Sequence, residues 1–420
     1  MYERRMEISQ ESNTQAGQGT IENGCRYIDS EQLKLEDKKI SIALMSSFVV
    51  LMVQYLILVS ADLMGTTTGR SVQLLSKIVV GTAFAYALPI VLRRNKKTCI
   101  GTYLAGISVL LTHYAMFPEN NAHQQQLMLP LFSMCLPAFI YSSTICDWKV
   151  LRDTMKKASY VVFCAGVLLG ILLLGGRASV GTYSMSLSYY LLLPALMFID
   201  EFVDRPSLKD VVSALLLILL ILAVGARGPI MCILVFIMLK LIGPRKRLRY
   251  TDLFAYLILL CLVVVMALSH DQLLAYTYHS LSRFGINSRS ILLFSQPQVY
   301  LTGRDALYTR VIDEIADSPF IGIGIGGDRR VLEGDYVHNL LIELMADYGI
   351  PLGSVFVLML VLLLSRFFIS RNKDQYDMFA IWLSIGMVPK LVSGSYLESM
   401  NFWIVLGLMS RGVVARNRHP

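Results

Sequence analysis

The sequence predicts an all-α, polytopic membrane protein with about twelve transmembrane helices and one long outer-face loop that carries amphipathic helices. Hydrophobic residues make up 55% of the 420 residues and charged residues only 16%, and the mean hydropathy is +0.56. This composition is far from that of soluble globular proteins. The apolar residues form long runs, with lysines and arginines clustered between them. By contrast, residues 300–353 look folded yet are too polar to cross a bilayer.

The chain divides into a polar tail and a helical domain. Residues 1–39 are polar and lack periodicity, so we expect a disordered cytosolic tail. This tail is too long and too acidic to begin a signal peptide, which makes residues 40–60 a retained membrane anchor. Residues 40–420 are expected to form one transmembrane helical domain, with residues 270–350 as its extracytoplasmic catalytic loop.

Twelve apolar runs define the expected transmembrane helices. They lie near residues 40–60, 72–92, 98–117, 127–146, 158–176, 182–199, 211–226, 229–242, 252–269, 351–369, 378–394 and 400–415. Most can cross roughly 30 Å of hydrocarbon at about 1.5 Å per residue. Basic clusters such as Arg93–Lys97 and Arg245–Arg249 fall on one side. The positive-inside rule therefore places both termini in the cytosol and the long polar loop outside.

The seventh and eighth runs form a short hairpin between Lys209 and Arg245. They provide roughly 53 Å of helix, against about 60 Å for two full crossings. The turn at residues 225–229 should therefore lie below the outer surface, where an arginine must face protein, water or an anion. We expect Arg227 to point into the recess that the long loop covers. The alternative is that Arg227 extends to the outer headgroups, as most arginines near span ends do.

The first helix of the polar loop is predicted to begin at Thr302 as its N-cap. Leu307, Val311 and Ile315 then share one apolar face. Arg304 falls in the first turn, where free backbone N–H groups and the helix dipole favour an anion. Without other evidence, Arg304 is equally well explained as an ordinary surface arginine.

The second loop helix is predicted to start near Asp335, with His338 in its first turn. A helix N-terminus disfavours the imidazolium form, so His338 should be neutral and able to accept a proton. Glu343, one turn further on, is expected to support the helix start. A lone histidine is more often structural, and we interpret His270 and His279 in that way.

Other residues of the loop are expected to be structural. The glycine-rich run 322–327 lacks the Gly-Lys-Ser/Thr ending of a phosphate loop and has no βαβ context, so it predicts close backbone packing that joins the two helices. Arg310 should point away from Arg304. Arg329 and Arg330 are expected to be a solvated charge pair, with a contribution to an anion site as the alternative.

Several of these residues form a recognisable pattern, which covers about fifty residues of the loop and one short motif upstream. The pattern consists of Gly225-Ala226-Arg227-Gly228, Gly303-Arg304, Ser318-Pro319, Gly322, Gly324, Gly326, Gly327, His338-Asn339, Glu343, Gly349 and Gly353. It resembles the O-antigen ligase and polysaccharide polymerase superfamily of multi-pass bacterial membrane glycosyltransferases.

The resemblance implies a GT-C-like architecture in the plasma (inner) membrane, with the active site on the outer face. The donor would be a polyprenyl (undecaprenyl) diphosphate-linked glycan and the acceptor a sugar hydroxyl. Arg227 and Arg304 would hold the diphosphate and His338 would be the catalytic base, with no metal and no cofactor. Two guanidinium groups can neutralise the leaving diphosphate without a metal. Direct attack of the acceptor on the anomeric carbon would invert its configuration.

Three functions remain open. We favour a polymerase, in which the acceptor is another lipid-linked glycan, because no outer loop resembles a basic dock for a phosphorylated core. The alternative is a ligase that transfers the glycan to a lipid A core. In a different class, a transporter of lipid-linked sugars or small solutes would also suit twelve spans. The expected partners are the lipid bilayer and other polysaccharide-assembly proteins. Nucleic acid is not expected, since the net charge of +8 is distributed as bilayer orientation requires.

Overall fold

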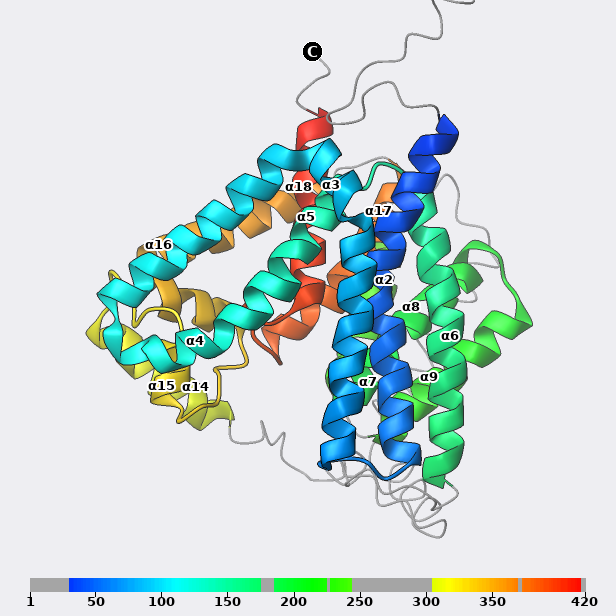
Figure 1. The fold of residues 1–420 in the computed structure, drawn as a ribbon, viewed down its shortest axis with the longest axis horizontal. Helices are drawn as coiled ribbons and strands as arrows, with labels where there is room; N and C mark the ends of the chain where they lie inside the picture. The colour runs from blue at the N-terminus through cyan, green and yellow to red at the C-terminus, as the bar shows by residue number, and fades with distance from the viewer. Residues whose placement is uncertain (1–29, 175–184, 225–226, 244–303, 369–371, 417–420) are drawn as a thin grey trace, which may run out of the picture.

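The computed structural model describes residues 30–174, 185–224, 227–243, 304–368 and 372–416, and this part of the chain is helical with no β-strand (Figure 1). The α-helices are α2 (Ser30–Ser60), α3 (Thr67–Met116), α4 (Asn121–Pro130), α5 (Leu136–Thr144), α6 (Trp148–Leu174), α7 (Met185–Tyr190), α8 (Leu192–Asp204), α9 (Leu208–Val224), α10 (Arg227–Ile242), α14 (Arg304–Asp317), α15 (Gly327–Val331), α16 (Leu340–Phe368), α17 (Lys373–Trp382) and α18 (Met400–Arg416). Short 3₁₀ and π turns join them, among them η1 (Pro118–Asn120), η2 (Leu131–Cys135), η3 (Leu383–Met387) and η4 (Val388–Leu391).

Five helical stretches are long and apolar enough to cross a membrane. They are Ser30–Ser60, Thr67–Met116, Pro118–Thr144, Trp148–Leu172 and Leu340–Phe368. On α3 and α16 only 17% of the most apolar window is buried in each case, so most of that surface suits a lipid environment. The all-α membrane class is thus confirmed. The twelve-span count stays a prediction, because other described helices are shorter and the run 252–269 lies outside the described residues.

Helix α3 joins two of the expected spans. The runs 72–92 and 98–117 form one helix that is broken at Asn95, whose φ and ψ are −138° and 38°. In Figure 1, α3 lies beside α2 up to the end of the bundle where the C-terminus is, and its second part then leads away toward α15. The kink at Asn95 therefore changes the direction of the chain where a loop between two spans was expected.

Helix α2 begins earlier than its apolar run, at Ser30, so residues 30–39 of the predicted tail are helical; residues 1–29 lie outside the described part. The reason is a buried ion cluster beside the α3 kink. Arg94 lies 2.6 Å from Glu36 and 2.6 Å from Asp37. Asp37 also accepts a hydrogen bond from the backbone N–H of Cys146 at 2.9 Å. These contacts join the first turns of α2 to α3 and to the start of α6.

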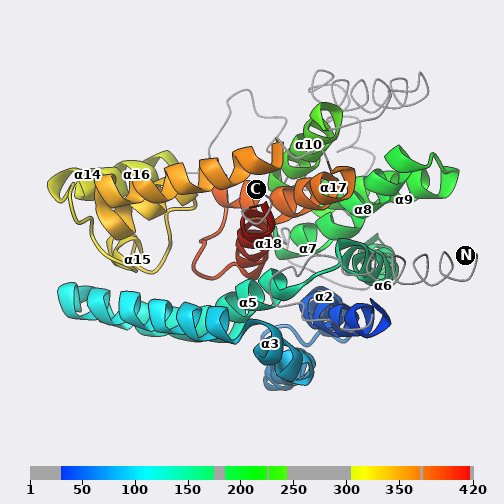
Figure 2. The same ribbon diagram turned by 90° about the horizontal axis from the view of Figure 1, so that it is seen from above.

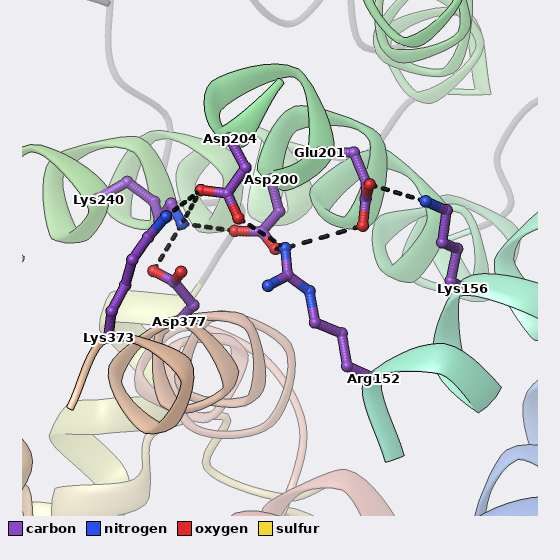
Figure 3. A network of polar contacts seen from close by, with 8 residues as sticks. All are labelled: Arg152, Lys156, Asp200, Glu201, Asp204, Lys240, Lys373 and Asp377. Atoms are coloured by element: carbon purple, nitrogen blue, oxygen red, sulfur yellow. Dashed lines mark hydrogen bonds and ion pairs between the residues drawn. The ribbon is translucent and has the colours of Figure 1, made fainter. Parts of the chain in front are cut away.

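A second ion cluster joins α6, α8, α10 and α17 (Figure 3). We call it the α8 ion network, and its members are Arg152, Lys156, Asp200, Glu201, Asp204, Lys240, Lys373 and Asp377. The Lys240 ammonium lies 2.6 Å from Asp200 and 2.6 Å from Asp377. Arg152 lies 2.5 Å from Asp200 and 2.9 Å from Asp204. The carboxylates of Asp200, Asp204 and Asp377 are close enough to hold a metal ion, but the Lys240 ammonium already bridges two of them.

Figure 2 shows the elements that position the loop. The second part of α3 continues with α4 and α5 as one row, and α16 with α14 and α15 forms another. Helix α18 lies between the rows and packs against both α5 and α16. Helix α15 contacts α4 and η1 as well as α16, so it bridges the two rows at the end far from α18.

Candidate active site

The glycine-rich run packs directly against the kink of α16. Gly322 and Gly349 both have left-handed backbones, with φ of 71° and 76°. A Cβ on Gly322 would lie 2.6 Å from the Gly349 nitrogen, so neither position has room for a side chain. The N–H of Ile323 donates to the Ala346 carbonyl at 2.7 Å, and the N–H of Ile350 donates to Pro319 at 2.8 Å. This backbone interlock confirms the prediction of close packing that joins the two loop helices.

The other face of the run is held by the α3–α4 connection. Asn120 is fully buried, and its amide donates to the Ile323 carbonyl at 2.7 Å. Its side-chain oxygen accepts from Arg330 Nε at 3.0 Å. The N–H of Ile325 donates to His113 Nδ1 at 3.1 Å, which gives this histidine a structural role. The Arg330 side chain is 37% exposed, as expected of a solvated arginine, and it also bridges the two rows through Asn120.

Helix α14 presents Arg304 at its first residue. Val311 and Ile315 are buried in a small core under the loop, and Leu307 packs against it, as their spacing predicts. The Arg304 guanidinium donates to the Val392 carbonyl, which lies just after η4. It forms no ion pair with any described residue. Thr302, the expected N-cap, lies outside the described residues.

Arg310 behaves differently from Arg304, as expected. Its side chain is 53% exposed, donates to the Val331 carbonyl at 2.7 Å and lies 3.7 Å from Glu333. It therefore occupies the rim of the loop.

His338 lies before the second loop helix and not in its first turn. The N-cap is Asn339, whose side-chain oxygen accepts from the N–H groups of Leu341 and Ile342 at 3.0 and 3.3 Å. Asp335 is exposed and does not cap α16. The prediction of the helix start was therefore wrong by several residues, because asparagine and aspartate are both good N-caps and only the fold selects between them.

The backbone of His338 is held in an unusual conformation. Its φ of 58° lies in the left-handed region, which costs a non-glycine residue on the order of 1–3 kcal/mol and is frequent at functional sites. Two anchors impose it. On one side the N–H of the buried Val337 donates to Asp328 at 3.2 Å, and on the other side Asn339 caps α16. The contacts of Val337 and Asn339 therefore fix the direction in which the imidazole leaves the backbone.

The electrostatics of the site keep the imidazole neutral. Burial lowers the pKa of His338 below its ordinary value of 6.5, and the charge of Arg304 lowers this pKa further. Asp335 and Asp328 act in the opposite direction, and Lys390 acts in the same direction as Arg304. The Nδ1 atom is buried and has no hydrogen-bond partner among the residues that the structure describes. The neutral state was predicted, but the helix dipole is not its cause.

Arg329 is buried, which corrects its prediction as half of a solvated pair. Its side chain is 5% exposed and lies 3.2 Å from Asp328, 3.8 Å from Glu343 and 3.7 Å from Glu398. The guanidinium also lies 5.5 Å from the centre of the Tyr336 ring. Surrounding carboxylates therefore compensate its charge, and its role is to hold the loop together.

Glu343 joins the loop to the segment before α18. It is fully buried, and its carboxylate accepts from the hydroxyl of Ser395 and from the N–H of Tyr396, the latter at 3.2 Å. The Tyr396 hydroxyl donates to the buried Asp347 at 2.7 Å. Glu343 was expected to support the start of its own helix, whereas its side chain fastens a distant segment.

Lys390 completes the set of cations around His338, and sequence reasoning missed it. It lies in η4, two residues before the carbonyl that binds Arg304, and its charge acts on the His338 imidazole. The only sequence signal is a lysine inside the apolar run 378–394. We refer to Arg304, Arg329, His338, Glu343 and Lys390 together as the loop site.

Arg227 is only partly described. It is the first residue of α10, and Pro229 lies in the first turn as predicted. Gly228 packs so closely on Tyr189 that an added Cβ would overlap the phenol ring. Helix α10 packs against η3 and η4. The side chain of Arg227 lies outside the described part, so its convergence with Arg304 and His338 stays a prediction.

The arrangement suits a reaction that develops negative charge and releases a proton. Arg304 and Lys390 present positive charge without a compensating ion pair in the described residues, next to a neutral imidazole with a free acceptor atom. Such a site can bind an anionic leaving group and remove a hydroxyl proton.

Comparison with known proteins agrees with this chemistry. Residues 212–357 match the family model described as O-antigen ligase. No curated protein and no solved structure matches the chain. The matched region begins in α9 and ends in α16, and it includes α10, α14, α15, Arg304 and His338. The match over residues 212–357 therefore supports a relationship to the O-antigen ligase and polymerase superfamily, and the apolar helices support a membrane protein.

Proposed function

We propose that the protein transfers a glycan from a polyprenyl diphosphate donor to a sugar hydroxyl of another lipid-linked glycan, as a polysaccharide polymerase. The observation that carries the proposal is the convergence, on the long polar loop, of Arg304 with a neutral His338 whose Nδ1 has no partner in the described part of the chain. A diphosphate is already a good leaving group, so the reaction needs charge neutralisation and a base more than a strong acid.

In this mechanism Arg304 and Arg227 bind the diphosphate oxygens with their guanidinium groups. His338 takes the proton from the attacking hydroxyl as that oxygen forms the bond to the anomeric carbon. The bond from the anomeric carbon to the diphosphate breaks on the opposite face, and the configuration inverts. The diphosphate leaves with both electrons of that bond and stays on the polyprenyl carrier. No step requires a metal.

The orientation of the chain supports an outer-face site. The basic residues at the α3 kink lie at the end of the bundle that carries the C-terminus, whereas α14 and α15 lie away from that end (Figure 1). By the positive-inside rule we place that end in the cytosol of a cell with this protein in its plasma membrane. The loop site then faces the compartment in which lipid-linked glycans are joined.

The test is a reconstitution of the purified protein with lipid-linked repeat units, with and without a lipid A core acceptor. Longer lipid-linked glycans formed without the core acceptor support the polymerase. Product formed only with the core acceptor replaces it by the ligase. Movement of lipid-linked sugar across sealed vesicles without any new glycosidic bond overturns both and favours the transporter.

A further inference from the structure

The segment that carries Lys390 interrupts an apolar run. The run 378–394 was expected to be one span, but the α-helix ends at Trp382 and is followed by the short turns η3 and η4. Irregular backbone then continues to the start of α18. At membrane depth such backbone is tolerated only where protein buries it or where it lines a polar cavity. The break in the helix therefore indicates that irregular backbone is used here to position particular side chains.

The break places the Lys390 ammonium by close packing. Gly394 has a left-handed backbone with φ of 85°, and an added Cβ would collide with Lys390 Nζ. The lysine side chain thus folds back over the glycine. The backbone N–H groups of Val392 and Ser393 close this turn on the Pro389 carbonyl, and the Val392 carbonyl in turn accepts from Arg304. One turn therefore positions two cations.

The Lys390 ammonium forms no hydrogen bond or ion pair with any described residue. The nearby carboxylates are committed elsewhere: Glu343 binds Ser395 and Tyr396, and Glu398 lies 3.7 Å from Arg329. A half-buried ammonium without a counter-ion is costly unless an anion joins it. This contrasts with Lys240, which lies 2.6 Å from each of two aspartates.

Lys390 also lies between the two expected halves of the diphosphate site. On one side its charge acts on His338, which Arg304 also faces. On the other side η4, which carries Lys390, packs against α10, whose first residue is Arg227. The position between Arg304 and α10 is the one that a diphosphate bound by both arginines would occupy.

We propose that Lys390 Nζ is a third cation that binds the phosphate oxygens of the polyprenyl diphosphate, a role that rests on the proposed function. The ligand class is a lipid-linked diphosphate, because this is the donor of the proposed function and because η4, which carries Lys390, packs against α10. Lysine suits this position as a compact point charge that contacts oxygens of both phosphates, whereas each arginine binds through a flat fork of donors.

The test measures the affinity of the full-length protein in nanodiscs for glycan-free undecaprenyl diphosphate, from the ligand-induced rise of Tm as the ligand is titrated. Parallel titrations use undecaprenyl monophosphate and phosphatidylglycerol. Lys390→Met removes the charge and keeps most of the length. Lys390→Gln is the second variant if Lys390→Met does not accumulate. Lys149→Met is the matched control, because Lys149 is 78% exposed and its ion pair of 3.7 Å is on the surface.

We expect Lys390→Met to weaken binding of the diphosphate by on the order of tenfold to a hundredfold, the loss typical of one charge-assisted hydrogen bond. Binding of the monophosphate should fall less, and Lys149→Met should bind as the wild type does. Unchanged diphosphate affinity in Lys390→Met or Lys390→Gln overturns the inference. A variant whose Tm is lower but whose Tm still rises with the diphosphate as much as that of the wild type also overturns the inference. An equal loss of affinity for phosphatidylglycerol does so too, because it would indicate a site for lipid headgroups. If the wild type itself does not bind the diphosphate, the proposed function fails first.

Discussion

The α8 ion network and the loop site both concentrate charge inside an apolar bundle, but they treat that charge in opposite ways. In the α8 ion network four cations face four carboxylates, and Lys240 and Arg152 each contact at least two of them. In the loop site only Arg329 is compensated in this way. Arg304 and Lys390 have no ion pair within the described residues. A closed network, in which each cation is paired with carboxylates, holds helices together. An open network, in which some cations have no ion pair, can bind an anionic ligand.

The largest expected effect in the loop site follows from removal of His338, the proposed base. His338→Asn should lower turnover by on the order of 10²–10⁴-fold, because asparagine tolerates the left-handed backbone but cannot take the proton. The measurement is the rate of glycan transfer in reconstituted vesicles. Normal turnover in His338→Asn would assign this residue a positioning role and would leave the open site without a base.

The pH dependence of transfer sharpens the same point. Since burial and Arg304 lower the pKa of His338, the base form persists below pH 6.5, and kcat/KM should fall on the acid side only below that value. Arg304→Gln removes one of the lowering charges, so its residual activity should fall at a higher pH than that of the wild type. If kcat/KM falls at the same acidic pH in both proteins, the effect of the Arg304 charge on the pKa of His338 is contradicted.

In the α8 ion network the largest effect is on stability and not on chemistry. Lys240→Met leaves Asp377 buried without its cation and leaves Asp200 with Arg152 alone, which should cost about 3–5 kcal/mol. The measurement is the thermal unfolding midpoint in detergent, with the exposed Lys149→Met as control. An unchanged unfolding midpoint in Lys240→Met would contradict the role of Lys240 as the cation that compensates these buried aspartates.

Arg304→Ala should lower turnover by on the order of 10²–10³-fold, as expected for the loss of one preorganised donor to a charge that develops in the transition state. Arg310→Ala is the matched control, since Arg310 lies on the same helix but on the rim. The unfolding midpoint of Arg304→Ala should be close to that of the wild type, because its only described bond is to one carbonyl. Equal activity of the two variants would remove Arg304 from the site.

The smallest effect concerns acid stability of the closed network. Burial acts to raise the pKa of Asp204, but the charge of Lys240 and hydrogen bonds from Lys373 and Arg152 outweigh it and hold this pKa at about 2. Because the folded pKa is depressed, the stabilisation is present at neutral pH and is lost as the pH falls from about 4 toward 2. Roughly 2 kcal/mol should disappear over this range in the wild type but not in Asp204→Asn. Parallel curves for the two proteins would contradict this assignment.

The sequence predicted those features of the loop that depend on local pattern. The buried face of α14 and the close packing of residues 322–327 follow from spacing and from glycine. The neutral state of His338 was predicted from a helix dipole, whereas burial and the charge of Arg304 produce it. Burial of Arg329 did not, because Glu343 and Glu398 are remote in the chain. Lys390 was not predicted for a related reason. It lies in an apolar run that predicts a membrane span, and only the fold shows that the helix is interrupted at η4.

The α8 ion network escaped notice in the same way. The pairing of its cations with Asp200, Asp204 and Asp377 depends on how α8, α10 and α17 pack, and no local pattern encodes that packing. Long-range ion pairing is thus the part of this molecule that composition and periodicity leave undetermined.

The interlock of Gly322 with Gly349 has a mechanical consequence. The backbone that leads to His338 is fastened to the kink of α16, a helix that is long and apolar enough to cross the hydrocarbon. Helices of fixed length change their tilt when the bilayer becomes thicker or thinner. A change in the tilt of α16 would therefore shift the imidazole relative to Arg304, and acyl-chain length in the surrounding lipid would act as a control on the rate of transfer.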